Sequence, residues 1–167
     1  MRWGAQLPLM MLLAVAIADP AAAVTQNASV NANVIKPLTL TALQDLDLGT
    51  ITLTPGVWSG ATVGISRMGV VSCSPDLICA GAPQVARFKV TGTNKMVVLI
   101  TAPDVTLTNQ SDASQKLILK IDNPGQMTLT SSGQPGSDFD LGGSLTLSST
   151  TAAGVYSGTI QVTVDYQ

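Results

Sequence analysis

The last residues of the chain alternate between apolar and polar positions. Every even position from Gly154 to Tyr166 is aliphatic, tyrosine or glycine, and the odd positions from Ser157 to Asp165 are polar. Successive side chains of a strand point to opposite faces, so the pattern predicts one strand with an apolar face and a polar face. Such a strand is unstable without a partner. The identity of that partner is therefore the first question about function.

Shorter alternating runs, separated by Gly, Pro, Asn and Asp, fill most of the remaining chain, and no helical periodicity is visible beyond the N-terminal segment. Leu38, Leu40, Leu46 and Leu48 alternate with polar residues, and Gly49 indicates a bulge or bend. Short strands with this punctuation predict an all-β, immunoglobulin-like antiparallel β-sandwich. The further strands expected are 61–67, 68–73, 84–91, 96–101, 105–108, 116–121, 127–130 and 144–148.

The N-terminus predicts export. Residues 1–23 read as a signal peptide, with Arg2 before a short apolar run and a cleavage site at the alanines ending at Ala23. The alternative is a retained N-terminal anchor, although the run is too short to span a membrane as a helix. We therefore expect a signal peptide at 1–23, an N-terminal extension at 24–35 and a sandwich domain at 36–167, exported through the periplasm to the cell surface and not membrane-spanning.

Composition argues against several classes of function. Charged residues are 11% of the chain and the net charge is −2. Because the Lys and Arg residues do not cluster, we expect no nucleic-acid binding. The chain has no His to act as a neutral-pH base and no glycine-rich phosphate loop. We expect no enzymatic activity, no cofactor and no metal.

Two cysteines, Cys73 and Cys79, flank a Ser-Pro-Asp turn in the segment CSPDLIC. In an exported chain this arrangement favours a disulfide. Zinc is the alternative, but two thiolates leave the ion short of ligands.

Three other motifs have both a structural and a functional interpretation. The pattern D-x-D-x-G at 45–49 and 138–142 fits either a calcium site or a strand with outward Asp side chains, and the chain has no Glu to complete a calcium loop. Trp58 fits an exposed ligand-binding loop or, as we favour, a cap on the core. Asn27 and Asn109 begin N-x-S motifs, which matter only in a host that glycosylates them.

Residues 24–35 also alternate, with Val24, Ala28, Val30, Ala32 and Val34 on one face. Lys36-Pro37 ends this run, because Pro lacks an N–H and restricts the residue before it to an extended backbone. The segment is either paired within its own sheet or donated to another molecule.

The C-terminus resembles the tail of chaperone–usher pilins. Tyr166 is penultimate, Val164, Val162 and Ile160 alternate before it, and Gly154 is the fourteenth residue from the end. The resemblance implies a sandwich that lacks its last strand. It implies a tail that contacts a periplasmic chaperone and then a like subunit, here through Gly154, Tyr156, Ile160, Val162, Val164 and Tyr166. An outer-membrane usher would be a further partner. The donor strand of the next subunit would insert Ala28, Val30, Ala32 and Val34.

The segments NVIKPLTLTALQDLDLGTI and AGVYSGTIQVTVDYQ are also similar to the DUF4402 group of exported bacterial domains. That group is thought to be pilin-like and related to spore-coat protein U-type subunits. We therefore expect a structural subunit of a fimbria-like fibre, a homopolymer assembled by strand donation. The alternatives are a carbohydrate-binding adhesin domain and a monomeric exported coat protein with a complete sandwich.

Overall fold

The computed structural model describes residues 24–167, so the expected signal peptide lies outside the described residues. The chain divides into two units, 1–33 and 34–167, which are described separately. In the first unit, residues 24–33 form no strand or helix, and all are exposed. Val30 is 91% exposed. The expected donor strand is therefore not a strand in the single chain.

The second unit consists of strands joined by turns, and among the described residues no helix is long and apolar enough to cross a membrane. Its strands are β1 (Thr39–Gln44), β2 (Thr50–Leu53), β3 (Ser59–Ile65), β4 (Val71–Cys73), β5 (Leu77–Ala80), β6 (Ala86–Thr91), β7 (Val97–Thr101), β8 (Val105–Asn109), β9 (Lys116–Asp122), β10 (Gln126–Thr128), β11 (Ser137–Ser148), β12 (Tyr156–Ser157) and β13 (Thr163–Tyr166).

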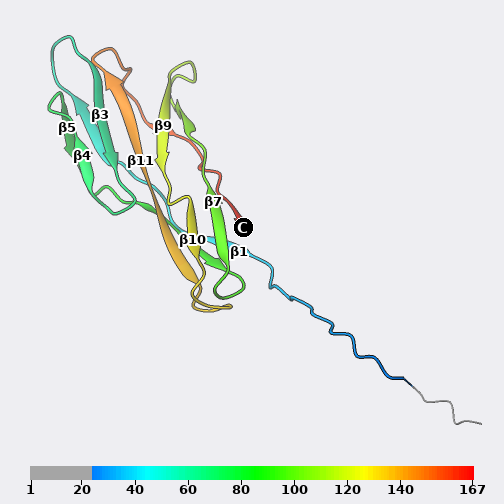
Figure 1. Ribbon diagram of the computed structural model, residues 1–167. Coiled ribbons are helices and arrows are strands. Elements are labelled where there is room, and N and C mark those ends of the chain that lie inside the picture. The colour runs from blue at the N-terminus through cyan, green and yellow to red at the C-terminus, as the bar shows by residue number, and fades with distance from the viewer. Residues whose placement is uncertain (1–23) are drawn as a thin grey trace, which may run out of the picture. The chain divides into compact units, whose positions relative to one another are not determined.

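All neighbouring strands pair antiparallel, and the expected antiparallel β-sandwich is confirmed. The largest sheet has the order β1-β6-β11-β9-β8-β12, with β3 on β11 and β4 on β3. Smaller sheets have the orders β10-β7-β13 and β2-β5. Figure 1 shows β11 running the length of the body, with β3, β4 and β5 toward one end and β7 and β10 toward the other.

Strand β11 joins two hydrophobic cores. Phe139 and Leu141 lie in the first core, together with side chains of β6 and β7. Leu145 and Leu147 lie in the second core, together with side chains of β3, β5 and β8. One strand of twelve residues therefore ties both halves of the body together.

Two long strands change sheets at a bend that contains proline. The chain breaks between β7 and β8 at residues 102–104, around Pro103, and between β9 and β10 at residues 123–125, around Pro124. Because proline has no N–H to donate to a ladder, it favours a break of this kind. β8 and β9 thus belong to the largest sheet, whereas β7 and β10 belong to the three-stranded sheet.

The bend around Pro103 also divides the C-terminal strand. The alternation at 154–166 predicted one continuous strand, but the structure forms β12 and β13 with an interruption from Gly158 to Val162. β12 pairs with β8 and β13 pairs with β7, and the register shifts by one residue between them. The prediction of continuity was wrong because the partner strand is broken at Pro103. The alternation of burial persists from Ile160 to Tyr166, with half-buried even positions and exposed odd positions, whereas Gly158 is exposed.

The structure differs from the expected strands at three further places. β11 begins at Ser137, well before the expected start at Ser144, because Phe139 and Leu141 are buried. The strand expected from Met68 begins only at Val71, since Met68 lies in a turn closed by the Ser66–Val70 backbone hydrogen bond. β5 was not expected, and it pairs with β2.

The Cys73–Cys79 disulfide is confirmed. It joins β4 to β5 and so links the largest sheet to the β2–β5 sheet. It closes a short loop, with a sequence separation of 6.

Replacing both cysteines by alanine should lower the free energy of unfolding by about 2 kcal/mol, because the unfolded chain loses a loop constraint. Urea unfolding followed by circular dichroism measures this loss. Wild type in reductant is the matched control and should lose a similar amount. An unchanged midpoint for the double variant would show that the bond does not contribute to stability.

Candidate site for strand addition

The C-terminal tail, residues 154–166, pairs inside its own body along one edge only. Tyr156 lies opposite Asn109 on β8, and β13 runs from Thr163 opposite Thr101 to Tyr166 opposite Val98. Within the described residues, no strand pairs with the other edge of β13. The backbone groups on that edge are therefore available to a further strand.

The segment 38–53, which contains β1 and β2, is likewise paired along one edge only. β1 pairs only with β6 and β2 pairs only with β5 within the described part of the chain. β1 and β13 do not pair with each other. The first strand of the body and its last strand are thus both edge strands.

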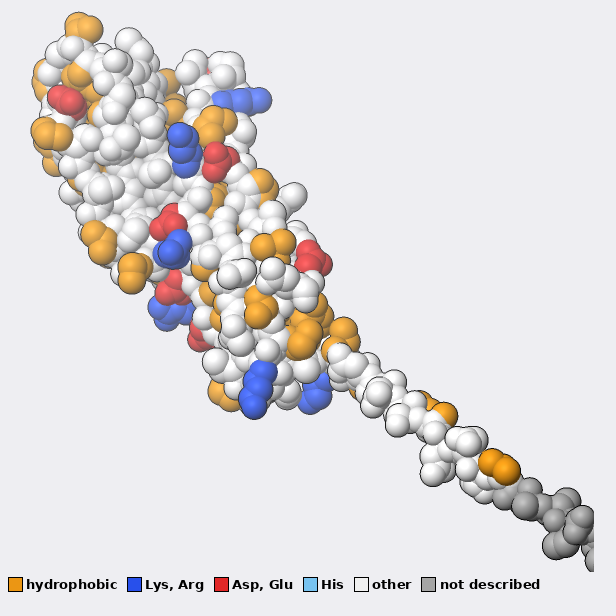
Figure 2. Space-filling model, in the orientation of Figure 1, with side chains coloured by type: hydrophobic (Ala, Val, Ile, Leu, Met, Phe, Trp, Pro, Cys, Tyr) orange, Lys and Arg blue, Asp and Glu red, His pale blue; other side chains and the backbone are white. Residues whose placement is uncertain are grey.

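The apolar side chains of both segments pack on the same core without being fully covered. Central strand β7 shows the contrast, because Val98 and Ile100 are only 0% and 2% exposed. The two edge segments instead contribute half-buried side chains to the first core: Leu38, Leu40 and Leu46 from one, and Ile160, Val162, Val164 and Tyr166 from the other. We call these two sets the flanking rows. Figure 2 shows hydrophobic side chains gathered on the surface around the place where Figure 1 marks the C-terminus.

The structure explains why glycine, and no larger residue, lies at position 154 at the start of the tail. The φ angle of Gly154 is +150°, and a Cβ there would overlap the amide of Asn109. Asn109 is 2% exposed, and its Nδ2 donates a hydrogen bond to the Ala153 carbonyl at 3.0 Å. Its Oδ1 accepts from the backbone N–H of Ser111 at 2.9 Å. The N-x-S motif at Asn109 therefore holds a buried amide that anchors the tail.

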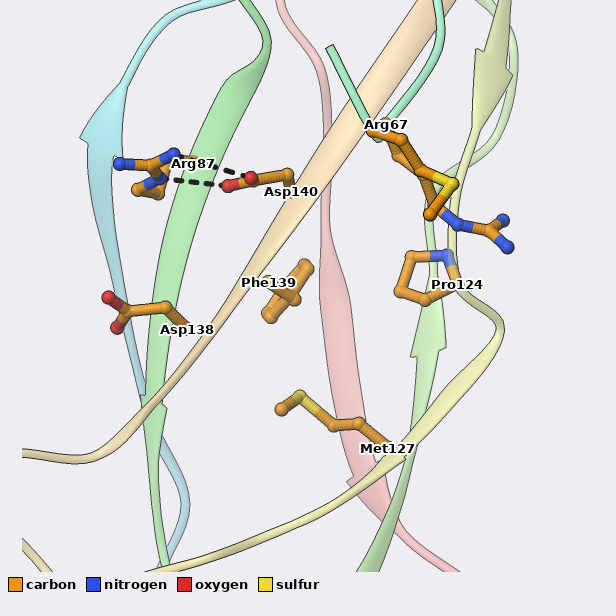
Figure 3. Close-up of a pocket in the computed structure, with 8 residues that line it drawn as sticks. Arg67, Arg87, Pro124, Met127, Asp138, Phe139 and Asp140 are labelled. Carbon is orange, nitrogen blue, oxygen red and sulfur yellow. Dashed lines mark hydrogen bonds and ion pairs between the residues drawn. The ribbon is translucent and has the colours of Figure 1, made fainter.

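Phe139 lies in a shallow hollow of about 450 Å³, lined by Arg67, Met68, Arg87, Pro124, Met127, Asp138, Phe139 and Asp140 (Figure 3). The hollow lies beside the first part of β11. There, from Ser137 to Leu141, β11 pairs with β6 along one edge, and in the described structure no strand pairs with its other edge. Its charged groups are all paired: Arg87 pairs with Asp140 inside the hollow, whereas Arg67 and Asp138 pair with Asp122 and Lys89, which do not line it.

The carboxylates of 138–142 point outward and form ion pairs. Arg87 Nε donates to Asp140 Oδ1 at 2.9 Å, and Lys89 Nζ lies 3.8 Å from Asp138 Oδ1. The hydrogen bond with Asp140 raises the pKa of the Arg87 guanidinium. In the other motif, Asp47 Oδ1 accepts from the Gly49 N–H at 2.8 Å, at the bend expected there. Within residues 24–167, no three acidic, His or Cys side chains cluster closely enough to hold a metal ion.

Trp58 caps the second core, as favoured from the sequence. Its ring is half-buried against that core, and its Nε1 donates to the Thr54 carbonyl at 3.0 Å. The ring therefore has a packing role and a satisfied polar atom.

Comparison with known proteins identifies a family. No curated protein matches the sequence. Residues 38–166 match the family described as a domain of unknown function, DUF4402. The matched region contains both flanking rows, from Leu38 to Tyr166. The chain therefore belongs to the DUF4402 family.

Proposed function

We propose that this protein is a structural subunit of a bacterial surface fibre and is joined to like subunits by strand donation. The observation that carries the proposal is the pair of edge strands at the two ends of the body. Their flanking rows pack on one core, yet each strand is hydrogen-bonded along a single edge. An added strand can supply the missing backbone partners and cover the half-buried side chains at once.

Residues 24–35 are the proposed donor. In the single chain, residues 24–37 are exposed and belong to no strand. Ala28, Val30, Ala32 and Val34 share one face of an extended segment, so they would lie against the flanking rows of a neighbour. Val30 and Val34 are 91% and 87% exposed, and burying each should contribute about 1.5 kcal/mol or more. The backbone ladder would add affinity, and the alternating side chains would fix the register.

Export and assembly complete the proposal. The disulfide is typical of an oxidising compartment such as the periplasm. A periplasmic chaperone would pair first with the open edge of the tail, and the extension of the next subunit would replace it at an outer-membrane usher. The resulting homopolymer would lie at the cell surface, and its function would need neither a cofactor nor catalysis.

The proposal is tested by separating donor from acceptor. Among the residues that the structure describes, the buried hydrophobic side chains lie between Ala61 and Leu147, so deleting residues 24–33 removes none of them. The full exported chain should form oligomers in light scattering, and the deletion variant should be a monomer. A synthetic peptide of residues 24–35 should raise the thermal midpoint of the deletion variant. At a peptide concentration of 100 Kd the stabilisation should be about 2.7 kcal/mol.

The matched control is the same peptide with Val30 and Val34 replaced by aspartate, which should give no shift. If the full chain is a monomer and the wild-type peptide does not raise the thermal midpoint of the deletion variant, the sandwich is complete without a donor. That result would favour a monomeric coat protein.

Val164→Ser should weaken peptide binding by roughly ten-fold, because it removes half-buried apolar surface from a flanking row and adds a hydroxyl there. Asp165→Ser is the control, since the neighbouring side chain is exposed on the opposite face. Titration of the peptide by fluorescence anisotropy measures both variants in the deletion background. Equal losses for the two variants would show that the tail row does not contact the donor.

Gly154→Ala should destabilise the body by about 1–3 kcal/mol, because the added methyl meets the Asn109 amide and the φ angle is unfavourable. Gly133→Ala is the matched control, with a φ angle of +121° but no atom within 4 Å of the added Cβ. Thermal unfolding compares the two variants. If both lose the same stability, the tail is not held at Asn109 and only backbone strain matters.

A further inference from the structure

Lys36, where the N-terminal extension meets the body, is hydrogen-bonded through all three of its polar groups. Its backbone N–H donates to Thr93 Oγ1 at 2.6 Å, and its Nζ donates to the Ser132 carbonyl at 3.1 Å. Its carbonyl accepts from the Tyr166 hydroxyl at 2.7 Å.

The Tyr166 hydroxyl also connects Lys36 to the loop after β6. It accepts a hydrogen bond from the Thr93 backbone N–H at 2.7 Å, so one oxygen joins residues 36, 93 and 166. Gly92 leaves room for this oxygen, since a Cβ at Gly92 would overlap both the Tyr166 hydroxyl and the Leu38 side chain. The last strand of the body, β13, is thus tied at one point to the residues that precede β1.

Pro37 adds a covalent restriction at the same place. Its ring fixes its own φ angle and restricts Lys36 to an extended backbone. Residues Val34 and Ile35, directly before Lys36, are exposed. The anchored region therefore ends at Lys36, where the extension begins.

We propose that Tyr166 is a positioning residue whose hydroxyl fixes the start of the N-terminal extension onto the final strand of the body. The role of this anchor in assembly rests on the proposed function. In a fibre, the edge that accepts a donor and the start of the subunit's own donor would form one hydrogen-bonded unit. A hydroxyl that bridges the two would favour association, since less chain must be ordered when the extension is donated.

Amide hydrogen exchange of the full chain, followed by NMR, tests the anchor without requiring assembly. Tyr166→Phe keeps the ring and removes the hydroxyl. It should speed exchange of the Lys36 amide about five-fold, although that amide is bonded to Thr93 and not to Tyr166 itself. Tyr156→Phe removes the other tail hydroxyl, which donates to the Ala152 carbonyl at 2.8 Å, and should leave Lys36 unchanged. The Leu141 amide in β11 should be unchanged in both variants, which excludes global destabilisation.

Association of the full chain is the second measurement. Tyr166→Phe should weaken oligomerisation about five-fold in sedimentation. Unchanged exchange at Lys36 in Tyr166→Phe would overturn the positioning role, whatever the state of assembly. If Tyr166→Phe speeds exchange at Lys36 but the wild-type chain never associates, the anchor is retained and strand donation is rejected.

Discussion

A strand is satisfied only when both of its edges have partners and both of its faces are covered. In this body β7 meets the first condition through β10 and β13, and its side chains Val98 and Ile100 are buried. β1 and β13 do not meet it, because each is paired along one edge in the described structure. The side chains of the flanking rows are only half-buried for this reason. The core is partly exposed along β1 and β13, where no neighbouring strand covers it. The position of the proposed donor is therefore a consequence of sheet order.

The two proline bends set the length over which the tail can pair. Strands β7 and β8 lie in different sheets because the chain breaks around Pro103, and the tail must follow that break. It does so with a register shift and an unpaired middle segment. Ile160 packs against both cores at this point, so the tail still covers the junction between the two halves of the body.

Local alternation in the sequence predicted which tail side chains face the core, and it predicted the class of fold. It could not predict the break in the tail, because the cause is Pro103 on the partner strand. The early start of β11 was missed for a similar reason, since Asp138 and Asp140 are paired by cations on β6 about fifty residues away. The contact between Tyr166 and Lys36 spans 130 residues of sequence. A penultimate tyrosine indicated a contact surface, but nothing local indicated that its hydroxyl would bind the start of the body.

The small side chains of residues 24–35 can be reconciled with strand donation through the order already present in the acceptor. Alanine and valine bury less apolar surface than leucine or phenylalanine, so the hydrophobic gain from the donor is modest. Binding must also offset the ordering of an extended segment. That cost is smaller if the acceptor strand is already fixed. The tail is held at one end by Asn109 and at the other by Tyr166, so it does not have to be ordered by the incoming strand. A weak donor and a preorganised acceptor edge are therefore complementary features of the proposed assembly.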